Sequence, residues 1–382
     1  VVMNLSLLGI FKYGSFFIGS VNGIFGSAIP DPGLPLPIGI SFFTFQSMSY
    51  TIDLYRRNIK VQKNFIDFAA FVTMFPQIVA GPIVRYEDVS AQLACRRIDL
   101  SSMSDGITRF VCGMCKKVLI ANSIGALWTD VKAQDYASMP AATAWLGIAA
   151  FTLQIYFDFS GYSDMAIGLG KMLGFDFPEN FRYPYNSKSI AEFWRRWHIT
   201  LGDWFKSYVY FPLGGSRGST AATIRNTLIV WLLTGLWHGA SWNFILWGLY
   251  YGVLIILEKF IFRRLLERTP SALRHILMML AVVFGWVMFE ITSPASELEF
   301  VKAMLGFGGS FANSFTLNAL HNYAVTFIAA IAISTGIPLK MCKKLPEKRA
   351  DTLSLVGEAA GMTACIACLV DSGYNPFLYF NF

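Results

Sequence analysis

Hydrophobic residues gather in long runs separated by short polar stretches, and this pattern predicts a helical chain that crosses a membrane many times. The apolar segments lie at residues 2–25, 38–55, 65–84, 106–131, 142–172, 199–213, 224–240, 242–262, 275–292, 321–340 and 352–371. Segment 65–84 contains Pro76, Gly81 and Pro82, and segment 199–213 is shorter than the roughly 20 residues that a spanning helix needs. We expect both to be re-entrant or interfacial, because broken backbone at membrane depth must be covered by protein or water.

Composition supports an all-α polytopic membrane protein. The 382 residues are 54% hydrophobic and 14% charged, whereas a soluble domain has about 25% charged residues. The net charge of +7 fits the Lys and Arg that cytoplasmic loops collect, so we expect membrane lipids and no nucleic acid as surroundings. Basic clusters lie at 56–63, 85–97, 171–196, 217–225, 263–274 and 340–349. Placing them in the cytoplasm makes the spans alternate if 65–84 and 199–213 do not cross, and it puts loops 132–141, 293–320 and 372–382 outside.

The six cysteines include two pairs with CxxC spacing, 112/115 and 365/368. A zinc site would require both pairs to meet, and small apolar packing residues are the favoured interpretation, so no metal is expected. The chain opens without a basic region or cleavage site and does not resemble a signal peptide. We expect it to start partway into a larger membrane protein.

His238 lies between segments 224–240 and 242–262, and it is one of only four histidines. An ionisable group at membrane depth costs roughly 2–3 kcal/mol on insertion scales, and histidine is suited to accepting and returning a proton near neutral pH. The alternative is a buried histidine satisfied by a backbone carbonyl. The cost of burial favours a functional role, with Trp237 and Asn243 as supporting residues. The turn after His238 is expected on the outer side.

His198 follows Arg195 and Arg196 in the stretch 193–205, where cations and aromatic residues give way to an apolar run. An interfacial helix explains the arginines and tryptophans. It does not explain a histidine at the point where the chain turns inward. A place in the site, with the two arginines as supporting residues, and a purely interfacial role therefore both remain open.

Asp158 and Asp164 place two carboxylates in the apolar segment 142–172. Spacings of four residues put Asp158 with Tyr162, and Ser160 with Asp164, on shared helix faces. These groups can orient a histidine or bind a polar substrate, or they can form interhelical hydrogen bonds. We favour a structural polar network that borders the cavity.

Seven motifs taken together resemble the membrane-bound O-acyltransferase family: residues 75–87, 156–168, 178–185, 192–198, 210–215, 235–243 and 376–382. The likeness runs nearly end to end and is greatest to the bacterial branch that acylates cell-envelope polymers, particularly the alginate-acetylating type. It implies one membrane domain over residues 1–382, with a ring of tilted transmembrane helices and re-entrant segments around a central tunnel. Members of the family usually begin with further hydrophobic segments, which implies that N-terminal segments are missing here.

The resemblance also implies a reaction. His238 matches the essential histidine of the family, and His198 matches its second position. An acyl group, here acetyl, would pass from a cytoplasmic thioester donor (acetyl-CoA or acyl carrier protein) toward hydroxyls of an exported polysaccharide. The setting would be the bacterial inner membrane, with extracytoplasmic acyltransferase proteins as partners and no bound cofactor. Together with the residues, this suggests His238 as general base, with His198, Trp237 or Asn243 stabilising the oxyanion.

Direct and ping-pong transfer both stay open, because no nucleophilic Ser or Cys adjoins either histidine in sequence. A transporter or flippase for a polysaccharide or lipid precursor is the competing class, since broken segments and polar groups at mid-membrane suit it equally well. Inverted repeats would favour that class, and we find none. A third interpretation is an assembly scaffold, for which neither histidine would matter.

Overall fold

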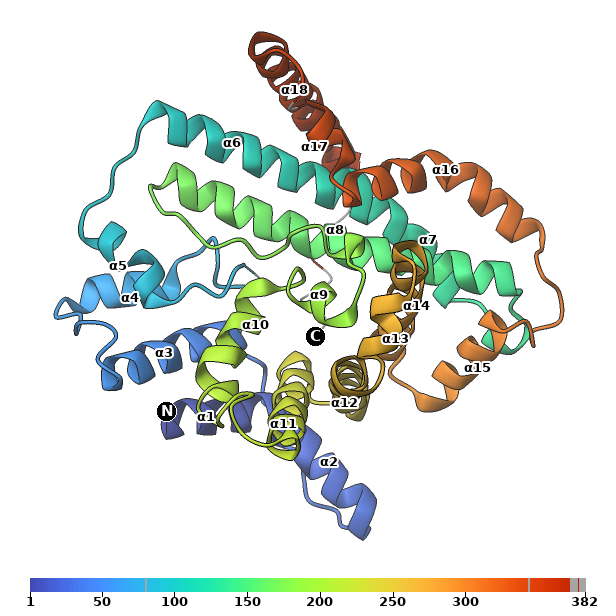
Figure 1. The fold of residues 1–382 in the computed structure, drawn as a ribbon, viewed down its shortest axis with the longest axis horizontal. Helices are drawn as coiled ribbons and strands as arrows, with labels where there is room; N and C mark the ends of the chain where they lie inside the picture. Colours follow the sequence, from blue (N-terminus) through green and yellow to red (C-terminus); the bar gives the residue numbers. More distant parts are fainter. Residues whose placement is uncertain (80, 343, 372–376, 378–382) are drawn as a thin grey trace.

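The computed structural model describes residues 1–79, 81–342, 344–371 and 377, and every regular element in this part of the chain is a helix (Figure 1). The first half holds α1 (Val2–Leu8), α2 (Gly14–Phe25), α3 (Ile40–Tyr55), α4 (Phe65–Thr73), α5 (Tyr86–Ala94), α6 (Leu100–Cys115), α7 (Asn122–Lys132) and α8 (Ala141–Met172). The second half holds α9 (Ile190–Trp194), α10 (Ile199–Phe205), α11 (Thr220–His238), α12 (Trp242–Ile256), α13 (Arg263–Arg268), α14 (Ser271–Glu290), α15 (Pro294–Met304), α16 (Ser314–Ser334), α17 (Ile337–Cys342) and α18 (Glu347–Asp371). Short π-helical or 3-10 turns are η1 (Gly9–Tyr13), η2 (Lys116–Ala121), η3 (Tyr136–Ser138), η4 (Pro184–Asn186), η5 (Lys206–Tyr210) and η6 (Leu257–Ile261).

Six helical stretches in the described residues are long and apolar enough to cross a bilayer, as the hydrophobic pattern predicts for a multi-pass membrane protein. They are Val2–Phe25, Leu100–Lys132, Trp242–Ile261, Ser271–Glu290, Ser314–Ser334 and Lys348–Val370. The segment expected at 142–172 is helical throughout as α8 but is not among these six, and neither is α11. Helix α8 carries Asp158 and Asp164, and α11 carries His238, which the sequence marks as candidate site residues.

The two weak segments are broken or short in the structure. Helix α4 ends at Thr73, and residues 74–79 and 81–85 contain no helix. The following irregular stretch is held inside the protein, because the buried Gln77 side chain donates to the carbonyl of Phe71 at 3.2 Å. Helix α10 and η5 cover only 199–210. The stretch 293–320, expected to be a loop, instead contains α15.

Parts of two sequence motifs lie outside the described residues: Ala80 of the motif at 75–87, and all of 376–382 except Phe377. The predicted outer loop at 372–382 falls largely outside them as well. Phe377 itself packs edge-on against Tyr162 of α8, with 4.8 Å between ring centroids.

Helices α6 and α8 form an antiparallel pair along one side of the molecule (Figure 1). Glycines allow their close approach, as is common between membrane helices. A Cβ atom added to Gly113 would lie 2.6 Å from the carbonyl oxygen of Gly161, and one added to Gly106 would lie 2.7 Å from that of Gly168. These opposed pairs fix the register of the two helices.

Ion pairs join the same two helices. The buried Lys117 of η2 pairs with Asp158 of α8, and Lys116 pairs with Asp164. Arg109 of α6 also contacts Asp164, at 2.6 Å. Charges removed from water are tolerated when they are paired in this way, so the α6–α8 interface is polar as well as close.

Helices α11 and α12 form a tight hairpin and lie side by side (Figure 1). Only residues 239–241 separate them. A Cβ atom on Gly235 would lie 2.2 Å from the carbonyl oxygen of Phe244, and one on Gly248 would lie 2.3 Å from that of Trp231. Because neither glycine can carry a side chain without a backbone shift, the hairpin fixes the end of α11 and therefore His238.

Candidate active site

His238 is the last residue of α11, and its ring is enclosed by aromatic side chains. Only 7% of the residue is exposed. Edge-on contacts join its ring to Trp237 (5.1 Å between centroids), Trp247 (5.0 Å) and Phe289 (5.5 Å). Its Nδ1 atom is buried and has no hydrogen-bond partner among the described residues. A buried polar atom left in this way costs about 1–3 kcal/mol, and such atoms call for an explanation such as a ligand or a catalytic role.

His198 precedes α10 in a strained backbone conformation, with φ 43° and ψ 55°. This left-handed region is uncommon for a residue other than glycine and costs about 1–3 kcal/mol, a strain that clusters at functional sites. Its Nδ1 lies 3.0 Å from the Oδ1 atom of Asn180. Because an amide oxygen only accepts, Nδ1 carries the proton and Nε2 carries the lone pair in the neutral ring. Nε2 is buried without a partner in the described part of the chain.

Asn180 holds His198 through a network that joins four segments. Its Oδ1 also accepts from the Thr200 hydroxyl at 2.9 Å, and its Nδ2 donates to Ser163 Oγ of α8 at 3.0 Å. The backbone N–H of Ile83 donates to the same Thr200 hydroxyl at 2.9 Å. Residues from the motifs at 75–87, 156–168, 178–185 and 192–198 therefore share one hydrogen-bond network that supports His198.

Trp237 brings the two histidines together. Its ring centroid lies 5.8 Å from that of His198 and 5.1 Å from that of His238. The Trp237 ring also packs against Phe42 and Phe45 of α3, with 5.5 Å and 5.7 Å between ring centroids. The predicted trio of His238, His198 and Trp237 thus forms one buried aromatic cluster.

Asn243 lies in the first turn of α12 and is buried near the same wall of the site. Its Nδ2 points to the carbonyls of Met288 (3.5 Å) and Phe289 (3.4 Å), and Phe289 is also a neighbour of His238. Its Oδ1 is buried with no partner among the described side chains and backbone groups. The atom of Asn243 that remains available for a hydrogen bond is therefore an acceptor rather than a donor.

The other four predicted site residues are held in ion pairs or are exposed. Asp158 and Asp164 face α6 and η2, where each is held in the ion pairs described above. Arg196 pairs with Glu192 at 2.7 Å, and Arg195 is exposed. Phe159, next to Asp158, is the α8 residue whose ring contacts His198, at 4.8 Å.

Two residues near the site are absent from the sequence-based candidates. Asn180 is one, and Lys12 is the other: its Nζ donates to the backbone carbonyl of Trp237 and to Ser41 Oγ at 2.9 Å. Lys12 is the only charged residue in the apolar segment 2–25. The cost of an intramembrane charge, which identifies His238, is the signal that would have found it.

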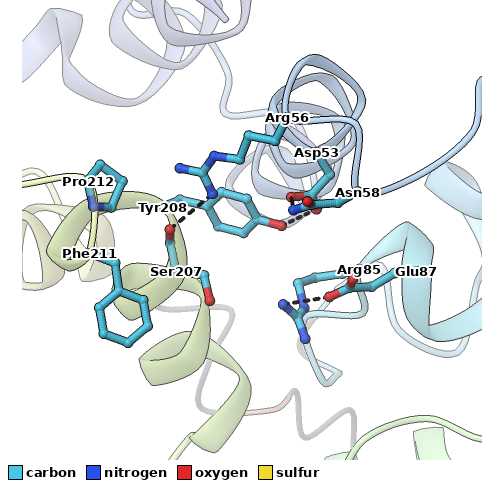
Figure 2. A pocket seen from close by; sticks show the side chains of 9 residues that line it. All are labelled: Asp53, Arg56, Asn58, Arg85, Glu87, Ser207, Tyr208, Phe211 and Pro212. Atoms are coloured by element: carbon cyan, nitrogen blue, oxygen red, sulfur yellow. Dashed lines mark hydrogen bonds and ion pairs between the residues drawn. The ribbon is translucent and has the colours of Figure 1, made fainter.

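A surface cavity of about 350 Å³ opens at the other end of α3 (Figure 2). Its rim carries Asp53, Arg56, Asn58, Arg85, Glu87, Ser207, Tyr208, Phe211 and Pro212. The Tyr208 hydroxyl donates to the Asp53 carboxylate, and burial together with that hydrogen bond and charge raises the pKa of Tyr208. The phenol therefore stays protonated and closes one wall of the cavity.

The two arginines of this cavity differ in their pairing. Arg85 is held by Glu87 at 2.7 Å. Arg56 donates to the carbonyl of Ser207 at 3.2 Å and lies over the Tyr208 ring at 5.5 Å, with no carboxylate within salt-bridge distance among the described residues (Figure 2). Arg56 therefore offers a charge to an incoming anion.

A second cavity, of about 680 Å³, lies between the end of α7 and the start of α15. Its lining is rich in hydroxyl, amide and carboxylate groups and includes Gln134, Asp135, Tyr136, Glu290, Thr292, Ser293, Ser296 and Glu299. Glu290 accepts from Lys132 at 2.6 Å and directly follows Phe289 in the chain. The cavity therefore begins one residue beyond the wall of the His238 site.

The two CxxC pairs meet through one cysteine each, with 3.8 Å between the sulfur atoms of Cys115 and Cys365. All six cysteines are free. Within the described ranges no group of three or more His, Cys, Asp or Glu side chains is arranged to hold a metal ion.

Comparison with known proteins places these motifs in context. Residues 42–296 match the model of MBOAT, the membrane-bound O-acyltransferase family. A probable alginate O-acetylase AlgI of Pseudomonas aeruginosa is 46% identical over 312 residues, which are 81% of this chain and 60% of that protein. A peptidoglycan O-acetyltransferase of Helicobacter pylori is 35% identical over 81% of this chain and 64% of its own length. A teichoic acid D-alanyltransferase of Bacillus subtilis is 27% identical over 66% of this chain and 67% of its own length.

This chain spans about three fifths of the length of the alginate relatives that it matches. The family model covers more than half of the chain and includes both histidines, the segment around Asn180 and the α11–α12 hairpin. The chain belongs to the membrane-bound O-acyltransferase family.

Proposed function

We propose that this chain carries the transfer site of an O-acyltransferase that moves an acetyl group from a cytoplasmic thioester donor toward hydroxyls of an exported polysaccharide, in a bacterial inner membrane. The observation that carries the proposal is the buried pair of His238 and His198 on either side of Trp237, each with a ring nitrogen that has no partner in the described structure. Family membership and relatives named for acyl transfer to alginate, peptidoglycan and teichoic acid support it.

His238 acts as the general base in this proposal. It accepts the proton of the acceptor hydroxyl while the hydroxyl oxygen attacks the carbonyl carbon of the thioester. The C–S bond of the tetrahedral intermediate then breaks, and the same proton passes to the departing thiolate. The products are an ester and a free thiol, so no further reactant is needed.

The tautomer of His198 limits its role. With Nδ1 donating to Asn180, the neutral ring presents only a lone pair at Nε2 and has no N–H to offer an oxyanion. The Nδ2 donor of Asn243 is likewise directed at backbone carbonyls. Of the three candidates for the oxyanion donor, Trp237 is therefore favoured, because an indole N–H can only donate and this residue contacts both histidines.

The Arg56 cavity is the proposed entry of the donor, on the face that the basic clusters assign to the cytoplasm. Ser41 and Asp53 are twelve residues apart on α3, about 18 Å along the helix axis. The long pantetheine arm of coenzyme A or a carrier protein suits such a distance. Phe45 of α3 stacks on Trp204 at 3.7 Å and contacts Trp237, so apolar side chains line α3 between the two sites.

The acceptor approaches from the opposite side in this proposal, through the cavity beside Glu290. Its hydroxyl, amide and carboxylate lining suits the hydroxyl groups of a sugar chain, or of a partner protein that relays the acyl group. Its Glu290 follows Phe289, whose ring contacts that of His238, so one segment of the chain joins this cavity to the His238 site.

The test is the ester content of the polymer in the native host, where donor and partner proteins are present. Cells with the wild-type protein are compared with cells carrying His238→Gln, matched for membrane abundance. Ester that is lost in the variant supports acyl transfer with His238 in the chemistry. Equal ester in both strains would overturn the role of His238 and favour a transporter or scaffold.

A further inference from the structure

The first candidate span, Val2–Phe25, is interrupted by the π-helical turn η1, which contains Lys12 and Tyr13. π-Helical turns within helices occur frequently at functional sites. A lysine within a membrane span is costly unless its charge meets partners inside the protein. Both features therefore call for a local explanation.

Lys12 finds its partners on two other helices. Its Nζ donates to Ser41 Oγ at the start of α3, at 2.9 Å, and to the backbone carbonyl of Trp237 in α11. The ammonium group also lies 5.7 Å from the centre of the Trp237 ring, within the range of a cation–π contact. One side chain thus ties the first span to α3 and to the residue before His238.

Tyr13 makes the matching contact one residue along. Its hydroxyl donates to the carbonyl of Leu236 at 2.7 Å. Leu236 and Trp237 lie in the last turn of α11, where backbone carbonyls have no N–H farther along the helix to bond. The two side chains satisfy two consecutive carbonyls directly before His238, and a cation is electrostatically favoured at this end of a helix.

The π-helical turn explains how neighbours in sequence reach neighbouring carbonyls. Successive side chains of an α-helix diverge by about 100°. The wider π-helical turn reduces this angle, so Lys12 and Tyr13 point toward the same end of α11. The π-helical geometry of η1 thus allows both side chains to bond the last turn of α11.

We propose that Lys12 and Tyr13 are positioning residues that clamp the last turn of α11 and thereby hold the rings of Trp237 and His238 in the geometry for acyl transfer. The clamp is a property of the fold, and only its effect on transfer rests on the proposed function. Small displacements at a reacting centre are costly, and about 1 Å can cost a hundredfold in rate.

Transfer kinetics give the first test. In membranes of the native host, Lys12→Met should lower the maximal rate of ester formation by roughly tenfold or more, and Tyr13→Phe by a smaller factor, while the donor KM stays within about twofold. Lys12→Arg should restore part of the rate, since it keeps the cation. Ile10→Met is the matched control, because Ile10 is 54% exposed on the same turn, and its rate should equal that of the wild type. Wild-type kinetics for Lys12→Met would overturn the proposal.

A second measurement does not depend on catalysis. Ser241→Cys places a thiol in the turn after α11, and its rate of reaction with a thiol reagent is measured with and without Lys12→Met, using the protein without Ser241→Cys as background. Release of the last turn should raise this rate severalfold. An unchanged labelling rate would overturn the clamp. This outcome does not depend on the His238→Gln comparison, so failure of the clamp and failure of the proposed function can be told apart. If Lys12→Met does not reach the membrane, Tyr13→Phe, which removes one hydrogen bond, decides both measurements.

Discussion

The Oδ1 atom of Asn180 lies 3.0 Å from Nδ1 of His198, and this contact places the ring proton on Nδ1 and leaves the lone pair on Nε2. The relationship joins two motifs that are separate in the sequence, at 178–185 and 192–198. The histidine that it holds has a left-handed backbone conformation and lies beside Trp237. Asn180, which lies next to the candidate site residues, therefore helps to position them.

Asn180→Ala should lower acyl transfer by about tenfold or more. The change removes the acceptor that fixes the His198 tautomer and leaves the Thr200 hydroxyl and the ring N–H without their common partner, at about 1–3 kcal/mol for each group. The measurement is polymer ester content per unit of protein in the membrane.

The control for this change is Asn186→Ala, in the same segment. The side chain of Asn186 donates one hydrogen bond, to the carbonyl of Thr335 at 2.8 Å. Its loss should leave transfer near the wild-type value. Equal losses in the two variants would mean that Asn180 matters for folding of the segment rather than for His198.

Gly235→Ala should destabilise the α11–α12 hairpin. The added Cβ atom would lie 2.2 Å from the carbonyl oxygen of Phe244, a backbone group that cannot turn aside. Overpacking of this kind costs about 1–3 kcal/mol, more than the roughly 1 kcal/mol that alanine gains over glycine in helix propensity. Thermal unfolding of the detergent-solubilised protein should show a lower midpoint.

Gly19→Ala is the matched control for that prediction. Gly19 is also inside a spanning helix, and a Cβ atom there would meet nothing within 4 Å. Its unfolding midpoint should equal or slightly exceed that of the wild type. A lowered midpoint for Gly19→Ala as well would show that glycine is needed in these helices for a reason other than close packing.

The sequence predicts the elements of this fold better than it predicts their contacts. Hydrophobic runs locate the six helical stretches that are long and apolar enough to span, because burial in lipid leaves a signal within one segment. The runs at 38–55, 142–172 and 224–240 are helical but are not among those six. The break after Thr73 is predicted in the same way, from Pro76, Gly81 and Pro82. Helix α15 is not predicted, because its mixed composition resembles that of a loop.

The sequence groups Trp237, His238 and Asn243 because these candidates lie close together in the chain, and their role in a site stays a prediction. Partners from distant segments are not predicted, because local spacing does not say which helix faces meet. Lys12 contacts Trp237 across 225 positions. Asp158 is expected in a structural polar network that borders the cavity. Its ion pair with Lys117 of η2 fits an interhelical role, but no pattern within α8 reveals that partner.

Gly218→Cys should react with membrane-impermeant thiol reagents only from the cytoplasmic side. Gly218 is exposed in the basic loop before α11, and such loops stay in the cytoplasm. Ser310→Cys, exposed in the stretch between α15 and α16, should react only from outside. Labelling is compared in intact cells and in inverted membrane vesicles. Reaction of both positions from one side would overturn the predicted topology, and with it the opposite entry of donor and acceptor.

Arg56→Gln should raise the KM for the thioester donor by roughly tenfold and leave the maximal rate nearly unchanged. A guanidinium without a carboxylate partner attracts a phosphate-bearing donor, and a charge-assisted hydrogen bond is worth about 1.5–3 kcal/mol. Because the cavity lies at the far end of α3 from Trp237, loss of the Arg56 guanidinium should weaken donor binding without disturbing the chemistry. The effect should also shrink at high salt, since exposed charges are screened.

Arg195→Gln is the control: Arg195 is equally basic and exposed but lies outside this cavity, so the donor KM of this variant should stay at the wild-type value. Equal rises in both variants would mean that general surface charge, rather than this cavity, attracts the donor.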